Sequence, residues 1–142
     1  MKQEWFIYPV QVYPQDTDYA GVVWHGRYLY WLEQARVAWL DQQGIKFRDL
    51  VAANCDLPVV DLFIRYHRPV YLGDEVLVKT RLRPRQGVRL VWDYELTRQG
   101  EPVCTAVVSL APLNRLTGKL YRRLPPLLDR VFAAWERDGR WV

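Results

Sequence analysis

The chain has 142 residues, of which 50% are hydrophobic, including 7 Trp and 9 Tyr, and 25% are charged. This is the size and composition of one folded domain, which excludes a disordered or fibrous protein. The net charge is only +4, and two cysteines are too few for a disulfide framework. No apolar run near either end is long enough to span a bilayer. We therefore expect one domain over residues 1–142, in the cytoplasm, without export or membrane insertion.

The first half of the chain predicts a strand, a loop and a long helix. Bulky and β-branched residues dominate residues 5–13, with Phe6, Tyr8, Val10 and Val12 alternating on one side, and Pro9 places part of this strand at a sheet edge or bulge. Residues 14–25 form an acidic loop, and residues 26–44 have helical spacing that ends at Gly44. The apolar face of this helix comprises Tyr28, Leu32, Ala35 and Trp39.

The second half of the chain changes to period two. Strands are expected within residues 57–70, 75–84, 88–98 and 102–114, followed by a short helix after Pro126 with Leu128, Val131 and Trp135 as its apolar positions. One strand, one helix and four strands is the element order of the hot-dog fold. The expected class is α+β, with a curved antiparallel sheet of about five strands wrapped around one long helix. A lone helix covers one face of such a sheet, so we expect self-association with two-fold symmetry.

Residues 16–36 combine ionisable residues with glycines: Asp16, Asp18, Gly21, His25, Gly26, Glu33 and Arg36. An acidic loop that runs into the first turn of a helix places carboxylates close to backbone N–H groups that have no intrahelical partner. Such donors polarise a carbonyl and stabilise an oxyanion, while a carboxylate such as Asp18 attacks it or activates water. The structural alternative is that Asp18 only accepts backbone hydrogen bonds in its loop. Asp16 is expected to be a turn or capping residue.

The segment VYPQDTDYAGVVWHGRYLYWLEQAR carries the pattern D-T-D-x-x-G-V-V, then His, then Y-x-x-x-x-E-x-A-R. It resembles the hot-dog acyl-CoA thioesterases of the 4-hydroxybenzoyl-CoA thioesterase family, especially the Tol-Pal-associated thioesterases and the 1,4-dihydroxy-2-naphthoyl-CoA hydrolases. The similarity extends through YHRPVYLGDEVLV. This resemblance implies that Asp18 is the catalytic carboxylate and that the backbone N–H of His25 faces the thioester carbonyl. It also makes the side chain of His25 and the acid Glu33 catalytic candidates, although Glu33 could instead pair with Arg36.

The resemblance also implies where the substrate is bound. Gly26 lies at the helix start, and basic residues near the turn RLRPRQGVR hold the phosphates of coenzyme A in family members, which selects Arg85 and Arg89. The structural alternative for this turn is a solvated hairpin kept soluble by its charge. No cofactor is expected, because coenzyme A is part of the substrate. His67 has no acid or Cys at ligand spacing, so no metal site is expected, and a solvent-facing or interface role is favoured.

The leading functional prediction is hydrolysis of an acyl-CoA or aryl-CoA thioester to a free acid and CoA by a homodimer or homotetramer. The Trp and Tyr residues would suit an aromatic acyl group, and 1,4-dihydroxy-2-naphthoyl-CoA is one candidate. Two alternatives are weighed. A hot-dog hydroxyacyl dehydratase generally presents a His with an acid from the partner chain, which differs from the pattern here. A non-catalytic nucleic-acid-binding module has no recognisable motif and only a modest positive charge to support it, so no nucleic acid is expected as partner.

Overall fold

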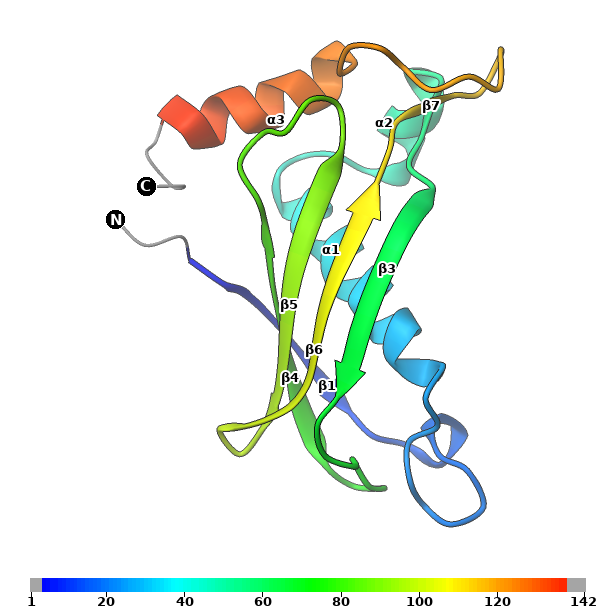
Figure 1. Ribbon diagram of the computed structural model, residues 1–142, viewed down its shortest axis with the longest axis vertical. Coiled ribbons are helices and arrows are strands. Elements are labelled where there is room, and N and C mark those ends of the chain that lie inside the picture. The colour runs from blue at the N-terminus through cyan, green and yellow to red at the C-terminus, as the bar shows by residue number, and fades with distance from the viewer. Residues whose placement is uncertain (1–3, 138–142) are drawn as a thin grey trace.

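The structure is a computed structural model that describes residues 4–137. Five antiparallel strands form a curved sheet in the order β1-β4-β5-β6-β3, and the long helix α1 lies behind it in Figure 1. The main strands are β1 (Phe6–Gln11), β3 (Val59–Tyr66), β4 (Glu75–Leu82), β5 (Leu90–Arg98) and β6 (Glu101–Leu110). The helices are α1 (Arg27–Gln42), α2 (Phe47–Ala52) and α3 (Pro126–Arg137), with a 3₁₀ turn at Pro14–Asp16. The predicted hot-dog arrangement is confirmed.

The core lies between α1 and the concave face of the sheet. All four residues predicted for the apolar face of this helix are buried: Tyr28, Leu32, Ala35 and Trp39. The helix ends just before Gly44, whose φ of +82° is a left-handed conformation that glycine adopts without steric cost. The long helix is therefore set by its apolar spacing and by a glycine stop, as its sequence indicates.

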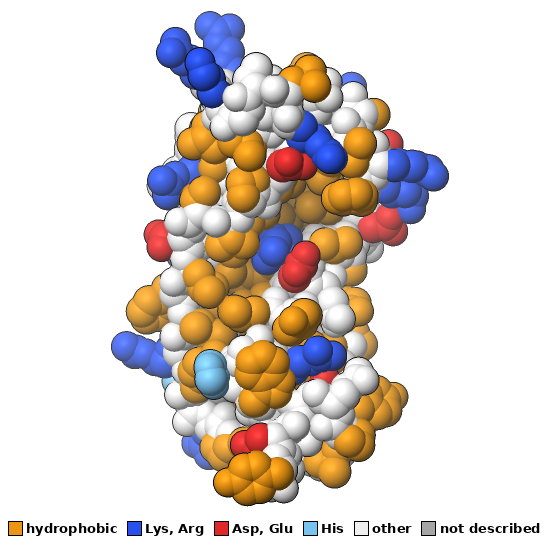
Figure 2. All heavy atoms as spheres, turned by 90° about the vertical axis from the view of Figure 1, so that its right-hand side faces the viewer, with side chains coloured by type: hydrophobic (Ala, Val, Ile, Leu, Met, Phe, Trp, Pro, Cys, Tyr) orange, Lys and Arg blue, Asp and Glu red, His pale blue; other side chains and the backbone are white. Residues whose placement is uncertain are grey.

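The two edges of the sheet differ. One edge is β1, a six-residue strand that contains the exposed Pro9, which has no N–H to offer a further strand. The other edge is β3, which has eight residues and pairs only with β6. Every residue of β3 except Ile64 is exposed, and five of the exposed residues are large and hydrophobic: Val59, Val60, Leu62, Phe63 and Tyr66. Figure 2 views the molecule from the β3 side and shows hydrophobic side chains over most of its height.

Helix α3 crosses one end of the sheet (Figure 1) and buries its predicted apolar positions Leu128, Val131 and Trp135. Three tryptophans meet under it: the ring of Trp39 lies 5.0 Å from that of Trp92, nearly perpendicular to it, and 5.3 Å from that of Trp135. The indole N–H of Trp135 also donates to Oε1 of Gln43 at the end of α1, at 3.1 Å. The C-terminal helix therefore completes the core rather than lying on the surface.

Helix α2 and strand β2 were not predicted, and β7 lies within residues 102–114, which were expected to form one continuous strand. Helix α2 buries none of its residues, so its sequence has no apolar periodicity to reveal it. Its start is fixed locally, because the carboxylate of Asp49 accepts the backbone N–H of Lys46 at 2.8 Å. The strands β2 (Cys55–Asp56) and β7 (Leu113–Asn114) pair only with each other and have two residues each, too few for an alternating pattern. Since none of these elements contributes a predicted site residue, the site description is unaffected.

The two cysteines predict a pH dependence of stability. Both are free and buried, and burial raises the pKa of the Cys55 thiol to about 11 and that of the Cys104 thiol to about 12, from an ordinary value of 9.0. Unfolded thiols therefore release protons from about pH 9 while the folded thiols keep theirs. The free energy of unfolding should be pH-independent below about pH 9 as far as these groups contribute, and should fall as pH rises towards 12. Urea unfolding at pH 8, 9.5 and 10.5 tests this. The decline should be shallower in Cys104→Ala, and an equal slope in that variant would contradict the assignment.

Candidate active site

Asp18 lies in a small hairpin that follows the 3₁₀ turn. Its backbone N–H donates to the carbonyl of Val22 at 2.8 Å, and Thr17 and Val23 form an antiparallel bridge. The hairpin is tied to the connection between β3 and β4, because the N–H of Val23 donates to the carbonyl of Val70 at 2.9 Å. Gly21 turns the hairpin with a φ of +78°. The segment DTDYAGVV therefore builds a fixed platform immediately before α1.

The carboxylate of Asp18 is held by one of its two oxygens. Oδ1 accepts the backbone N–H groups of Ala20 at 2.8 Å and of Val22 at 3.2 Å. No hydrogen bond to Oδ2 is found within residues 4–137, and the residue is exposed. Thus the structural role weighed for Asp18 is present, but it engages only one oxygen. The other oxygen is available to a substrate or a water molecule in a fixed direction.

Asp16 differs from Asp18, because its carboxylate is buried and both of its oxygens accept hydrogen bonds. It is 2% exposed, its Oδ2 accepts the backbone N–H of Tyr13 at 2.8 Å, and its Oδ1 accepts Nε of Arg27 at 2.6 Å. Both oxygens are therefore used within the fold. The predicted turn and capping role is confirmed, and Asp16 joins the loop to the first residue of α1.

The start of α1 presents backbone donors. Neither the N–H of His25 nor that of Gly26 donates a hydrogen bond within the described part of the chain, whereas the N–H of Arg27 donates to the carbonyl of Trp24 at 3.0 Å. A Cβ at Gly26 would lie 2.1 Å from the indole of Trp24, so any side chain there would force that ring to move. The structure thus combines free N–H groups with the positive end of a sixteen-residue helix, as an oxyanion site requires.

Tyr66, at the end of β3, fixes the backbone at this helix start. Its hydroxyl donates to the carbonyl of His25 at 2.5 Å, and its ring packs edge-on against that of Tyr28 at 4.9 Å. Burial, and secondarily the thiol of Cys104, raises the pKa of the Tyr66 hydroxyl, which keeps the donor protonated. Sequence reasoning missed this residue, because its alternation in β3 marks only a strand. Only the fold shows that β3 ends beside His25.

A cleft of about 350 Å³ opens at this point between α1 and β3. It is lined by Val23, His25, Tyr28, Tyr66, His67, Arg68 and Pro69. Both histidines of the chain therefore line one cleft, and the ring of His67 contacts the hydroxyl of Thr105 through Nε2 at 2.9 Å. Asp18 does not line it directly. The connection runs through Val22, which donates to Asp18, and its neighbour Val23, which forms part of the wall.

Glu33 is not brought to this cleft within one chain. It is exposed two helical turns further along α1 and lines a different pocket, of about 630 Å³, with Tyr8 and Phe47 among its other walls. The alternative ion pair with Arg36 is not formed, and that reading is wrong. Arg36 is buried and donates instead to the hydroxyl of Tyr94 at 3.2 Å. A catalytic role for Glu33 remains a prediction.

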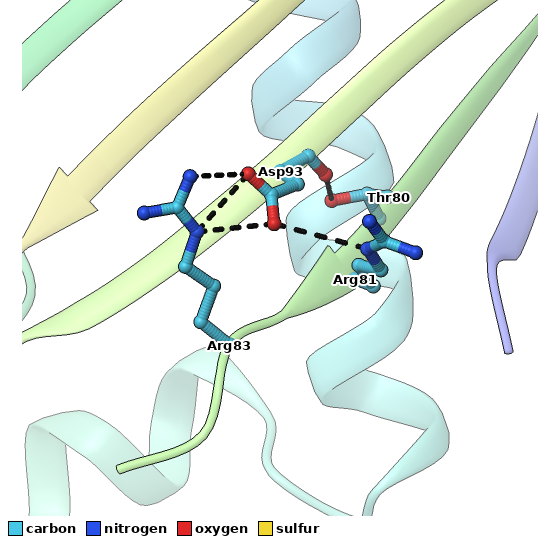
Figure 3. A network of polar contacts seen from close by, with 4 residues as sticks. All are labelled: Thr80, Arg81, Arg83 and Asp93. Atoms are coloured by element: carbon cyan, nitrogen blue, oxygen red, sulfur yellow. Dashed lines mark hydrogen bonds and ion pairs between the residues drawn. The ribbon is translucent and has the colours of Figure 1, made fainter. Parts of the chain in front are cut away.

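The basic turn between β4 and β5 is largely neutralised by the chain itself. Oδ1 of Asp93 accepts a hydrogen bond from Nη2 of Arg83 at 2.7 Å, and Oδ2 of the same carboxylate lies 3.8 Å from Nε of Arg81 (Figure 3). Arg85 pairs with Asp129 at 2.5 Å and with Glu136 at 3.3 Å, both on α3. In residues 4–137 no ion pair of Arg89 is found, and this residue is exposed. Of the two predicted phosphate anchors, only Arg89 has an uncommitted guanidinium. Arg85 holds α3, a role that neither sequence interpretation of the turn included.

No group of three or more His, Cys, Asp or Glu side chains that could hold a metal ion occurs in residues 4–137. No helix in the same range is long and apolar enough to cross a membrane.

A hot-dog fold with a loop carboxylate in front of a helix start is the arrangement that the sequence resemblance predicts for a thioesterase. Comparison with known proteins agrees: the Thioesterase-like superfamily profile matches residues 12–135, and the chain belongs to this family. A Synechocystis protein assigned provisionally as an esterase is 46% identical over 89% of this chain and 78% of its own length. The 1,4-dihydroxy-2-naphthoyl-CoA hydrolase of Synechococcus elongatus is 33% identical over 82% and 84% of the two chains. A DHNA-CoA thioesterase structure from Staphylococcus aureus superposes with a TM-score of 0.80 at 28% identity, covering 98% of this chain and 89% of that one. The predicted family and enzyme class are confirmed.

Tyr66→Phe tests the positioning of the helix start. Removing the hydroxyl leaves the ring contact with Tyr28 but frees the carbonyl of His25. Loss of one such hydrogen bond, about 0.5–1.5 kcal/mol, should lower kcat roughly two- to ten-fold with little change in KM. Steady-state hydrolysis of a CoA thioester measures this. The same change at Tyr30, an exposed residue of α1 whose hydroxyl makes no hydrogen bond among the described residues, is the control. Equal kinetics for the two variants would remove Tyr66 from the site.

Proposed function

We propose that this protein hydrolyses acyl-CoA or aryl-CoA thioesters, with Asp18 as the catalytic carboxylate. The observation that supports this most strongly is the hydrogen bonding of the Asp18 carboxylate. One of its oxygens accepts two backbone N–H groups, and the other accepts no hydrogen bond from residues 4–137. This arrangement orients a reactive oxygen without consuming it. The naphthoyl-CoA hydrolases among its relatives support a CoA thioester as substrate and an aryl acyl group as one candidate.

The reaction needs two groups that this chain can supply. The N–H groups of His25 and Gly26 would donate hydrogen bonds to the thioester carbonyl oxygen and stabilise the negative charge that develops on it. Asp18 would then either attack the carbonyl carbon, giving a mixed anhydride that water cleaves, or remove a proton from the attacking water. Both routes release CoA as a thiol and an acid product. The ring of His25, exposed in the cleft, would orient the substrate or the water.

The protein is proposed to be a homo-oligomer, a homodimer or a homotetramer. The exposed hydrophobic residues of β3 are the support, because a long apolar edge strand is a template for another strand. The cleft beside Tyr66 opens at that same edge, so a partner there would help to close it. The free, buried thiols fit the reducing cytoplasm expected from the composition. Arg89 is the proposed contact to a CoA phosphate.

A substrate panel tests the function. The purified protein is given acetyl-, palmitoyl-, benzoyl- and 1,4-dihydroxy-2-naphthoyl-CoA, and released thiol is followed with a chromogenic disulfide reagent. We expect thiol release from at least one of them, with aryl thioesters preferred. Since the two native thiols are buried, they should contribute little signal. Absence of thiol release from the whole panel, with protein shown to be folded, would reject the proposal.

A further inference from the structure

We propose that the hairpin of residues 113–120, called the Leu116 hairpin below, docks the protein on an anionic phospholipid surface together with the two arginines that follow it. The contact is made by a loop at the bilayer surface rather than by a membrane-spanning segment, and it does not depend on the proposed hydrolysis. The Leu116 hairpin is closed by an antiparallel bridge between Leu113 and Leu120 and projects beyond the end of the sheet in Figure 1. Since the loop that carries Asp18 lies at the other end, the hairpin takes no part in the site of its own chain.

The Leu116 hairpin exposes two leucines. Leu116 is 78% exposed and Leu120 is 54% exposed, and Gly118, with a φ of +72°, turns the chain between them. A single exposed leucine is ordinary on a protein surface. Two aliphatic side chains on one projecting loop, however, are suited to enter the boundary between lipid headgroups and acyl chains. What decides between these readings is the charge and the backbone around them.

The charge around the two leucines is entirely positive. Four exposed cations surround them in sequence: Arg115, Lys119, Arg122 and Arg123. No acidic residue occurs between Glu101 and Asp129. Nε of Arg115 lies 3.5 Å from Oδ1 of Asp56, whereas no ion pair of the other three is found in residues 4–137. The turn between β4 and β5 differs, because most of its arginines pair with acids of the chain. The Leu116 hairpin therefore keeps uncommitted cations, for which lipid phosphates are suitable counterions.

The backbone donors of the Leu116 hairpin are satisfied within the protein. Oδ1 of Asn114 accepts the N–H groups of Leu116 at 2.8 Å and of Thr117 at 3.3 Å. The carbonyl of Asn114 accepts the N–H of Gly118 at 2.8 Å, and Oγ1 of Thr117 accepts the N–H of Lys119 at 3.3 Å. The N–H groups at positions 114 and 115 also donate to backbone carbonyls. Because an unpaired N–H is costly away from water, a loop with all these donors paired can enter an apolar interface with its leucines.

The side chains favour a lipid surface over nucleic acid. Sites that bind single-stranded nucleic acid stack its bases on aromatic rings. The one aromatic residue among residues 113–124 is Tyr121, which is half-buried and donates through its hydroxyl to the carbonyl of Asn54 at 2.9 Å. Leucines beside arginines and a lysine match a headgroup region instead. The aliphatic side chains enter it, while the long cationic side chains keep their charges at the level of the phosphates.

Vesicle sedimentation tests the proposal. The purified protein is mixed with vesicles of phosphatidylcholine alone or of phosphatidylcholine with phosphatidylglycerol. Binding is expected only to the anionic vesicles, and it should weaken as salt is added. Arg122→Ala with Arg123→Ala should lower the partition coefficient roughly thirty-fold, the loss of two cations from a charged surface. The matched control is Lys79→Ala with Arg137→Ala, which removes the same charge from β4 and the end of α3. It should change binding by less than about two-fold, because these charges would lie beyond the screening distance.

A leucine variant separates a lipid surface from a soluble phosphate. Leu116→Ser should weaken binding to the anionic vesicles about ten-fold, because it removes an aliphatic side chain from the interface. Leu72→Ser, at a leucine that is 50% exposed in the loop between β3 and β4, should leave binding unchanged. Absence of binding to the anionic vesicles would reject the proposal. Binding that needs the arginines but not Leu116, with a raised KM for a CoA thioester in the arginine variant, would assign these arginines to the substrate phosphates and overturn the lipid contact.

Discussion

Asp18→Asn is expected to lower kcat/KM for a CoA thioester by about 10²–10⁴, the range typical of losing a general base or nucleophile. Asparagine has the same shape, and its amide oxygen can still accept the N–H groups of Ala20 and Val22. The hairpin should therefore keep its structure while the reactive oxygen is lost. Thiol release under saturating and limiting substrate, together with the thermal midpoint, measures both effects.

Asp16→Asn is the matched control for that variant. The same chemical change two residues earlier affects a carboxylate that is buried and paired with Arg27. It should lower the thermal midpoint, because breaking a buried pair leaves a charge uncompensated. The two variants should therefore differ in what they lose: Asp16→Asn should lose mainly stability, and Asp18→Asn should lose mainly activity. Full activity in Asp18→Asn would exclude it as the catalytic carboxylate.

Trp39→Ala is expected to cost about 3–5 kcal/mol of the free energy of unfolding, the range for removing a large aromatic side chain from a core. Trp39 is 2% exposed, and its ring packs against those of Trp92 on β5 and Trp135 on α3. Its removal loosens the contact between α1, the sheet and the C-terminal helix together. Urea unfolding monitored by circular dichroism measures the loss.

Trp24→Ala is the comparison for the core variant. Trp24 has a similar size but is 40% exposed beside the helix start, so its removal should change unfolding by less than about 1 kcal/mol. It frees the space above Gly26, and its effect should therefore be on kinetics rather than on stability. Similar losses of stability in the two variants would show that the tryptophan cluster is not a centre of the core.

Most of the fold was predictable because its main elements bury regular patterns. The face of α1 that includes Leu32 and Trp39 repeats at helical spacing, and the turn at Gln99 and Gly100, both with positive φ, separates two alternating strands. Helix α2 was not predictable, since it is short, begins at one capping carboxylate and has no fully buried residue; only Leu50 packs partly against the core. The role of α3 was predicted only in part. Its apolar positions were evident, but its pairing with Arg85 depends on contacts more than forty residues away in sequence.

The part of the candidate site whose residues lie close together in the sequence was predictable. Asp18, Gly26 and the helix start lie within one continuous motif, so their proximity follows from the sequence. Tyr66 and His67 reach the same cleft only because β3 ends beside the start of α1, which no local pattern shows. For Glu33 and Arg36, spacing on a helix suggested an ion pair, but the buried hydroxyl of Tyr94 takes the arginine instead. Long-range packing decided these cases.

The position of α3 has a consequence for how this protein can change over time. In Figure 1, α3 crosses one end of the sheet while the loop that carries Asp18 lies at the other. Arg85, Asp129 and the tryptophan cluster thus act at a distance from the reacting groups. Substitutions in α3 should therefore change thermal stability more than they change the groups that react. Conversely, the Asp18 hairpin can adapt to a new acyl group while the far end keeps the chain folded.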